Sequence, residues 1–145
     1  MQKFVENTFA SKELYLKLLN PVCEKYGLTQ TEMVILMSLT DNPGEDTATG
    51  IIKKRKLKKS VISVALRSLQ EKGYVIGEHK DGNHRSIHLQ ICEAALPIIA
   101  SGKEAQEQFV HIMLNGFSDD EKKQLKNFFD RITANIAGYS SSEKE

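Results

Sequence analysis

Little in this sequence points to chemistry on a substrate. It has only two cysteines, Cys23 and Cys92, which lie far apart and form no Cys-x-x-Cys pair. This spacing fits a reducing cytoplasm better than a disulfide scaffold. The G-x-S-x-G, Walker A and H-E-x-x-H patterns are also missing, and no carboxylates are spaced as an acid–base pair. We therefore expect a protein that is not an enzyme and uses no cofactor.

A long uninterrupted hydrophobic run is missing as well. The amino-terminal segment MQKFVENTFASKELYLKLL carries charges throughout, so it predicts neither a signal peptide nor a membrane span. A length of 145 residues, with 40% hydrophobic and 27% charged residues, is typical of one soluble globular domain. We expect a cytoplasmic protein with no membrane partner.

Acidic residues are absent from one segment. The formal net charge is only +1, yet no Asp or Glu lies between Asp46 and Glu71, where seven Lys and Arg residues gather. A solvated helix face with a lysine-rich loop is the common explanation of such a run. Segregated positive charge in a nearly neutral protein favours instead a local anionic partner. The structural elements around this segment distinguish the two explanations.

Helical periodicity dominates the chain. A first helix is predicted over residues 3–26, with Pro21 inside it. Thr29 and Glu32 then have the spacing of a capping box, in which each residue's side chain bonds to the other's backbone. The apolar run 33–39 predicts a short, largely buried second helix, and the turn residues of 41–46 break the pattern.

A third helix is predicted over 47–56 and a fourth over 58–72. At 100° per residue, one face of the fourth helix collects apolar side chains: Val61, Ile62, Ala65, Leu66 and Leu69. The opposite face carries small and cationic groups and one valine: Ser60, Ser63, Arg67 and Val64. One face is thus suited to a core and the other to a partner.

After this helix the period changes. Two β-prone segments flank an Asp-Gly pair and predict a hairpin over about 74–91. Further helical patterns cover 93–137, where Ser118 and Glu121 form a second capping-box pair, and a flexible tail is expected at 139–145. The expected fold is therefore one domain over 1–138, mostly α with a small β-hairpin wing (α+β).

Helix, turn, helix and two-stranded ribbon in this order are the plan of a winged helix-turn-helix, here over about 47–72 with its wing at 74–91. The fourth helix would enter the major groove of double-stranded DNA, because small side chains let its backbone come close. Its candidate contact residues are Lys58, Lys59, Ser60, Val61, Ser63, Val64 and Arg67. Those of the wing are Lys80, Asn83, His84 and Arg85, and the candidate phosphate contacts are Lys53, Lys54 and Lys56.

Four segments in order resemble the MarR family of bacterial-type transcriptional regulators. They are GLTQTEMVILMSL (27–39), LKKSVISVALRSLQEKGYV (57–75), DGNHRSIHLQICEAA (81–95) and FSDDEKKQLKNFFDRI (117–132). Two departures from the family pattern matter. Asn83 stands where the wing usually has Asp, and Val64 stands where Arg is frequent, which shifts the expected base contacts toward thymine methyl groups.

The resemblance implies a homodimer on a palindromic operator. Helices 3–26 and 93–137 would form its interface, and their apolar stripes exceed what one small winged core requires. The candidate interface residues are Phe4, Phe9, Phe109, Met113, Phe128 and Ile132. A small-molecule effector would bind between the DNA-binding and dimerisation regions, in an apolar pocket lined by the first, second and fifth helices.

Three alternatives stay open. His79, His84 and His88 cluster on the hairpin, but no Cys or carboxylate joins them at ligand spacing, so ordinary wing residues are preferred over a metal site. Cys23 is read as a buried, inert thiol and not as an oxidant sensor. Finally, a winged helix can also serve protein interaction or non-specific nucleic-acid binding. A preference for one DNA sequence separates a regulator from such a module.

Overall fold

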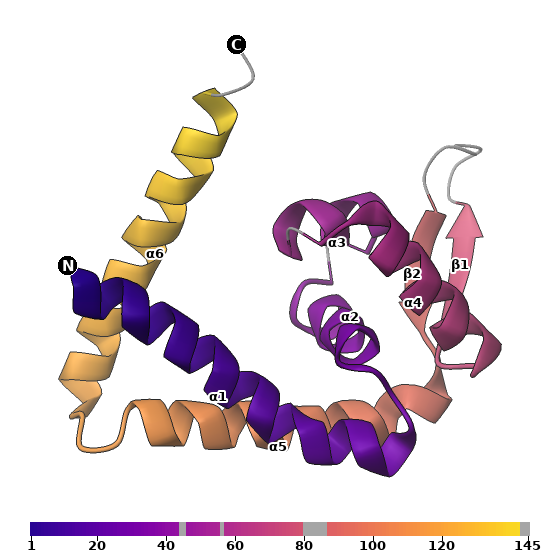
Figure 1. Ribbon diagram of the computed structural model, residues 1–145, viewed down its shortest axis with the longest axis horizontal. Coiled ribbons are helices and arrows are strands. Elements are labelled where there is room, and N and C mark those ends of the chain that lie inside the picture. Colours follow the sequence, from indigo (N-terminus) through magenta and orange to yellow (C-terminus); the bar gives the residue numbers. More distant parts are fainter. Residues whose placement is uncertain (44–45, 56, 80–86, 143–145) are drawn as a thin grey trace. The chain divides into compact units, whose positions relative to one another are not determined.

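The computed structural model describes residues 1–43, 46–55, 57–79 and 87–142 (Figure 1). The chain forms two compact units, Met1–Phe109 and Val110–Glu145. The predicted fold class, mostly α with one small hairpin, is confirmed. None of the described helices is both long and apolar enough to cross a lipid bilayer.

Four helices open the first unit: α1 (Gln2–Tyr26), α2 (Gln30–Asp41), α3 (Ala48–Arg55) and α4 (Lys59–Glu71). Helix α1 continues through Pro21 and ends at Gly27, whose φ of 63° is the left-handed conformation that favours glycine. The Leu28 N–H then donates to the Cys23 carbonyl at 2.9 Å and closes the end of the helix. The four helices predicted from periodicity are thus confirmed.

Helix α2 begins with the predicted capping box. The Glu32 N–H donates to Thr29 Oγ1 at 3.1 Å, and the Thr29 N–H donates to a Glu32 carboxylate oxygen at 3.4 Å. Seven of the twelve residues of α2 are buried, including Met33 and Met37. This helix is therefore the centre of the core, against which α1, α4 and the hairpin pack.

The hairpin consists of β1 (Val75–His79) and β2 (Ile87–Ile91), paired antiparallel with Val75 opposite Ile91. Figure 1 shows it beside α4, and its tip at residues 80–86 lies outside the described residues. On its other edge, β2 meets the segment that precedes α3. The Leu89 N–H donates to the Asp46 carbonyl at 2.7 Å, and Thr47 forms an isolated β-bridge with His88.

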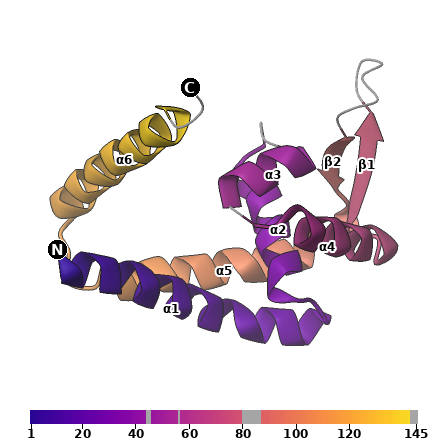
Figure 2. The same cartoon turned by 45° about the horizontal axis from the view of Figure 1, so that its top comes forward.

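A short 3-10 helix, η1 (Glu93–Ala95), leads into α5 (Leu96–Met113). Figures 1 and 2 both show α1 and α5 side by side. Gln106 Nε2 donates to the Tyr15 hydroxyl oxygen at 3.2 Å, and the rings of Tyr15 and Phe109 meet edge to face with centroids 5.5 Å apart. On the side of α5 that faces α2, a Cβ added at Gly102 would lie 2.5 Å from Met37 Sδ, near the end of that side chain.

The second unit contains the end of α5 and helix α6 (Asp119–Ser142). The predicted capping box at its start is present, with the Ser118 N–H donating to Glu121 at 2.7 Å and the Glu121 N–H donating to Ser118 Oγ at 3.3 Å. Helix α6 extends to Ser142 and so includes part of the segment 139–145 that was expected to be a flexible tail. None of the residues 110–139 is buried within the single chain.

Candidate nucleic-acid interface

Helix α4 has the two-sided character that the sequence predicts. Ile62, Ala65, Leu66 and Leu69 are buried in the core. On the other side, exposed side chains form what we call the outer face of α4: Ser60, Val61, Ser63, Val64 and Arg67. The periodicity argument placed Val61 with the core residues, but its side chain is 40% exposed because it lies at the border between the two faces.

The first turn of α4 is suited to a negative charge. Lys58 occupies the N-cap position with no side-chain hydrogen bond to the helix, and both Lys58 and Lys59 are exposed. The Lys58 carbonyl accepts from the N–H groups of Val61 and Ile62 at 3.0 and 3.1 Å, so the helix is well formed from its start. Two cations beside the positive end of a helix dipole attract anions such as DNA phosphates.

The hydroxyl group of Ser63 is already used within the helix. Its Oγ donates to the Lys59 carbonyl at 2.9 Å. This residue therefore offers a compact surface that lets a partner approach, and its oxygen can still accept a hydrogen bond.

All the predicted DNA contacts, those of α4 included, stay predictions. Lys53 and Lys54 belong to α3, which places their backbone just before the turn into α4. Lys56 and the four wing candidates lie outside the described residues: Lys80, Asn83, His84 and Arg85.

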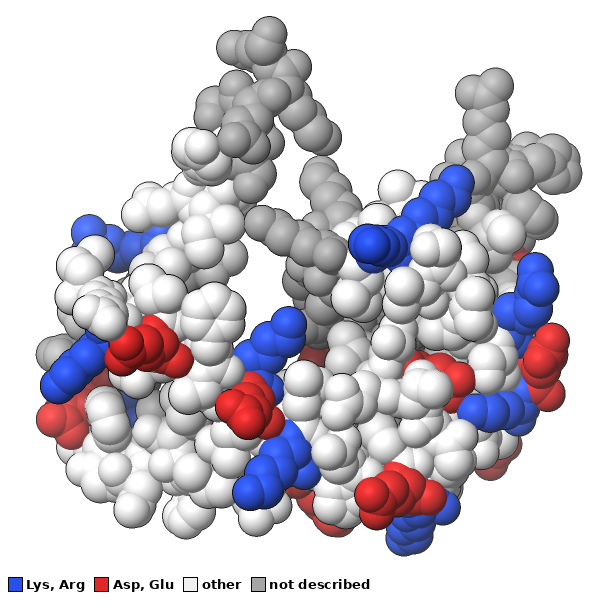
Figure 3. Space-filling view, in the orientation of Figure 1, with Lys and Arg blue, Asp and Glu red and all other residues white. Residues whose placement is uncertain are grey.

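On the face of the molecule shown in Figure 3, cationic and anionic side chains are interspersed over much of the described surface. On this face the described cations do not gather into one patch.

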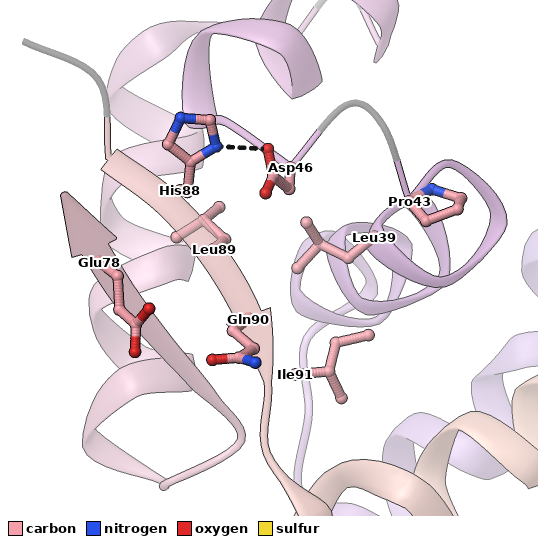
Figure 4. A pocket seen from close by; sticks show the side chains of 8 residues that line it. All are labelled: Leu39, Pro43, Asp46, Glu78, His88, Leu89, Gln90 and Ile91. Atoms are coloured by element: carbon pink, nitrogen blue, oxygen red, sulfur yellow. Dashed lines mark hydrogen bonds and ion pairs between the residues drawn. The ribbon is translucent and has the colours of Figure 1, made fainter. Parts of the chain in front are cut away.

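The base of the wing is fixed by a contact that sequence reasoning missed. His88 Nδ1 and Asp46 Oδ1 are 2.7 Å apart, as Figure 4 shows, and the Leu89 N–H bonds to the backbone of the same Asp46. Asp46 appears in the sequence only as a turn residue, so no local signal could have revealed this role. The pair connects the segment before α3 to β2, and the wing is thereby attached to the helix-turn-helix.

A hollow of about 380 Å³ lies beside this pair (Figure 4). It is lined by Leu39, Pro43, Asp46, Glu78, His88, Leu89, Gln90 and Ile91. This is not the place predicted for an effector, between the first, second and fifth helices. At Gly102, where α5 faces α2, the ends of the Met33 and Met37 side chains fill the space, and an added carbon would require them to shift.

An ion pair attaches the far end of α4 to the start of α2. Lys72 Nζ lies 2.9 Å from Glu32 Oε2 and donates to the Gly27 carbonyl at the same distance. The Glu32 side chain is only 5% exposed. Burial raises the pKa of this carboxyl, but hydrogen bonds from Lys72 and Ser68 outweigh it, so the pKa lies below its ordinary value.

The structure bears on two of the alternatives, an oxidant-sensing Cys23 and a metal site formed by the hairpin histidines. Cys23 is buried in the core, and burial raises the pKa of its thiol, which opposes the thiolate form that reacts with oxidants. Among the described residues, no three His, Cys, Asp or Glu side chains come together as a metal site would need. His84 lies outside the described residues.

The predicted interface residues lie largely on the surface of the single chain. Phe4, Phe9, Met113 and Phe128 are between 42% and 70% exposed, whereas Phe109 and Ile132 are partly buried. Further exposed apolar side chains on α6 are Phe129, Ile136 and Tyr139. Monomeric soluble proteins seldom expose so many large apolar groups on a few helices.

Known structures share this fold over most of its length. A MarR-family regulator from Listeria monocytogenes, solved with a 26mer DNA, has a TM-score of 0.81 at 16% identity over 92% of this chain and 89% of its own. A MarR regulator from Methanosarcina mazei has a TM-score of 0.78 at 16% identity, covering 96% of this chain and 93% of its own. One from Silicibacter pomeroyi has 0.78 at 20% identity, covering 94% and 90%.

At such identities the likeness shows the fold alone, and a second comparison concerns the sequence. The model of the MarR family matches residues 26–86, which run from the end of α1 through the helix-turn-helix to the hairpin. The matched part therefore contains α3, α4 and β1 and ends before β2. Over this part the chain is similar to the MarR family, and over most of its length it has the winged helix-turn-helix fold of MarR regulators.

Proposed function

We propose that this protein is a cytoplasmic transcriptional regulator that binds double-stranded DNA as a homodimer at a palindromic operator. One observation carries the proposal: the outer face of α4 is exposed, has small side chains and lies in a segment without a single acidic residue between Asp46 and Glu71. Such a helix fits the width of the major groove, and its flanking lysines can contact phosphates.

The homodimer is supported by the second unit. Helix α6 has 24 residues and no buried side chain in residues 119–139. Most helical stability in proteins comes from packing an apolar face, which this helix has exposed. A second copy that covers this face would remove its apolar groups from water. It would also present two α4 helices to the two halves of a palindrome.

A small-molecule effector is compatible with a homodimer that presents two α4 helices to DNA, although DNA binding does not require one. A small molecule would act by favouring one separation of the two α4 helices over another. The hollow beside Asp46 and His88 is one place to look for it, because its size is that of a small-ligand site.

The test is a selection of bound sequences from a random pool of duplex DNA, followed by affinity measurements at one fixed salt concentration. We expect a palindromic winner that binds about a thousandfold more tightly than scrambled DNA of the same length. Binding to every duplex alike, with an affinity that only follows the salt concentration, would instead show the non-specific nucleic-acid module.

A further inference from the structure

Two exposed valines interrupt the polar outer face of α4. The side chain of Val64 is 72% exposed and that of Val61 is 40% exposed. Because they are three residues apart in one helix, they are neighbours on its surface. Both are β-branched and rigid, so they present fixed methyl groups to whatever approaches this side of α4.

The surroundings of this pair favour one kind of partner. Lys58, Lys59 and Arg67 are exposed on the same helix or at its start, and no acidic residue lies nearby in the sequence from Thr47 to Gln70. An apolar protein partner would have to desolvate these cations, whereas a polyanion would bind them. Charge therefore selects DNA as the occupant.

The outer face has little else with which to distinguish bases. From Lys59 to Arg67 the helix contains no Asn, Gln, Asp or Glu, whereas the exposed Gln70 and Glu71 lie in its last turn. The Ser63 hydroxyl group already donates to the Lys59 carbonyl. The remaining donors are the hydroxyl of Ser60 and the guanidinium of Arg67. In the major groove, the apolar feature that separates one base from the others is the C5-methyl group of thymine.

We propose that Val61 and Val64 form a contact surface for thymine methyl groups, so that the operator carries thymine at the base pairs facing these two residues. This proposal rests on the function proposed above and adds the chemical class of the bases that are recognised. An operator read in this way would require thymine where the valines lie, while Ser60 and Arg67 contact neighbouring positions.

The test removes single methyl groups from the DNA. In the duplex obtained from the selection, each thymine of a half-site, with its symmetry mate, is replaced by deoxyuracil, which pairs identically and lacks only the C5-methyl group. We expect one or two positions at which this replacement weakens binding of the full-length protein about fourfold per half-site, since each contact buries about one methyl group.

The second arm changes the protein. In Val64→Ala, thymine and deoxyuracil at the sensitive position should bind within about twofold of each other, because the partner of the methyl group is gone. Ser63→Ala is the matched control on the same face and should keep the full sensitivity to deoxyuracil. Both residues are exposed, so circular dichroism should show that both variants fold.

The outcomes separate this inference from the proposed function. A preferred duplex that binds equally well with every thymine replaced would overturn the methyl contact and leave the regulator intact. A full deoxyuracil penalty in Val64→Ala would also overturn it. If no duplex is preferred at all, both proposals fall together.

Discussion

At the scale of single residues, the contact between Glu32 and Lys72 has consequences beyond its own position. Glu32 caps α2 through Thr29 and at the same time binds the lysine that follows α4. The Glu32 carboxylate therefore takes part both in a local capping box and in a contact with a residue distant in the sequence. The orientation of α4, and with it the outer face, depends on this pair as well as on the packing of apolar groups.

We predict that Lys72→Met lowers the free energy of unfolding by about 2 kcal/mol near neutral pH. The variant leaves a buried carboxylate without its cation, and the estimate is at the low end for such pairs because the Lys72 side chain is 34% exposed. Urea unfolding followed by circular dichroism measures the change. Lys103→Met, which replaces an exposed lysine of α5, is the control and should change stability by less than about 0.5 kcal/mol.

The contact between Glu32 and Lys72 also predicts that its contribution to the free energy of unfolding decreases at acidic pH. The pKa of Glu32 is lower in the folded protein than its ordinary value, so its contribution to stability is complete above the ordinary glutamate pKa of about 4.3. It is lost as the pH falls through the folded-state pKa. The difference between the wild-type protein and Lys72→Met should therefore shrink on acidification, and an equal difference at about pH 7 and about pH 3 would contradict the assignment.

At the scale of helices and strands, two glycines with opposite surroundings test the packing of α5 and α6. Gly102→Ala should lower the free energy of unfolding by about 1–3 kcal/mol. Its new Cβ would press on the ends of the Met33 and Met37 side chains, which are fully buried and would have to shift within the packed core. Gly138→Ala meets nothing within 4 Å and should stabilise its helix by up to about 1 kcal/mol. A stabilising Gly102→Ala would mean that the core adapts freely at this point.

At the scale of the whole molecule, the exposed aromatic side chains predict an assembly. Phe128→Arg should shift the protein from dimer to monomer in sedimentation velocity experiments. Burying one Phe contributes about 1.5–3 kcal/mol, and a two-fold interface loses this contribution twice. We expect dimerisation to weaken by at least about a hundredfold and operator binding to weaken with it.

The control for this prediction is Lys123→Glu, an exposed position of the same helix. It alters the charge of α6 without removing an apolar group, so the dimer should persist. If Phe128→Arg sediments as a dimer while keeping its affinity for the operator, the dimer interface lies elsewhere on the chain.

The sequence by itself determined the elements and their order. The capping boxes at Thr29 and Ser118 could be predicted because both partners lie three residues apart in the chain. The buried side of α4 followed from the helical period, apart from Val61 at its border. Such features depend on backbone geometry over one or two turns, which is the same wherever the sequence occurs.

Only the tertiary structure decided which distant residues meet. Asp46 and His88 are 42 residues apart, and Glu32 and Lys72 are 40 apart. No periodicity relates such partners, since their contact depends on how whole elements pack against one another. The close approach at Gly102 and the attachment of β2 to the segment before α3 arise in the same way. They are set by the volume and shape of the assembled core, which no local pattern encodes.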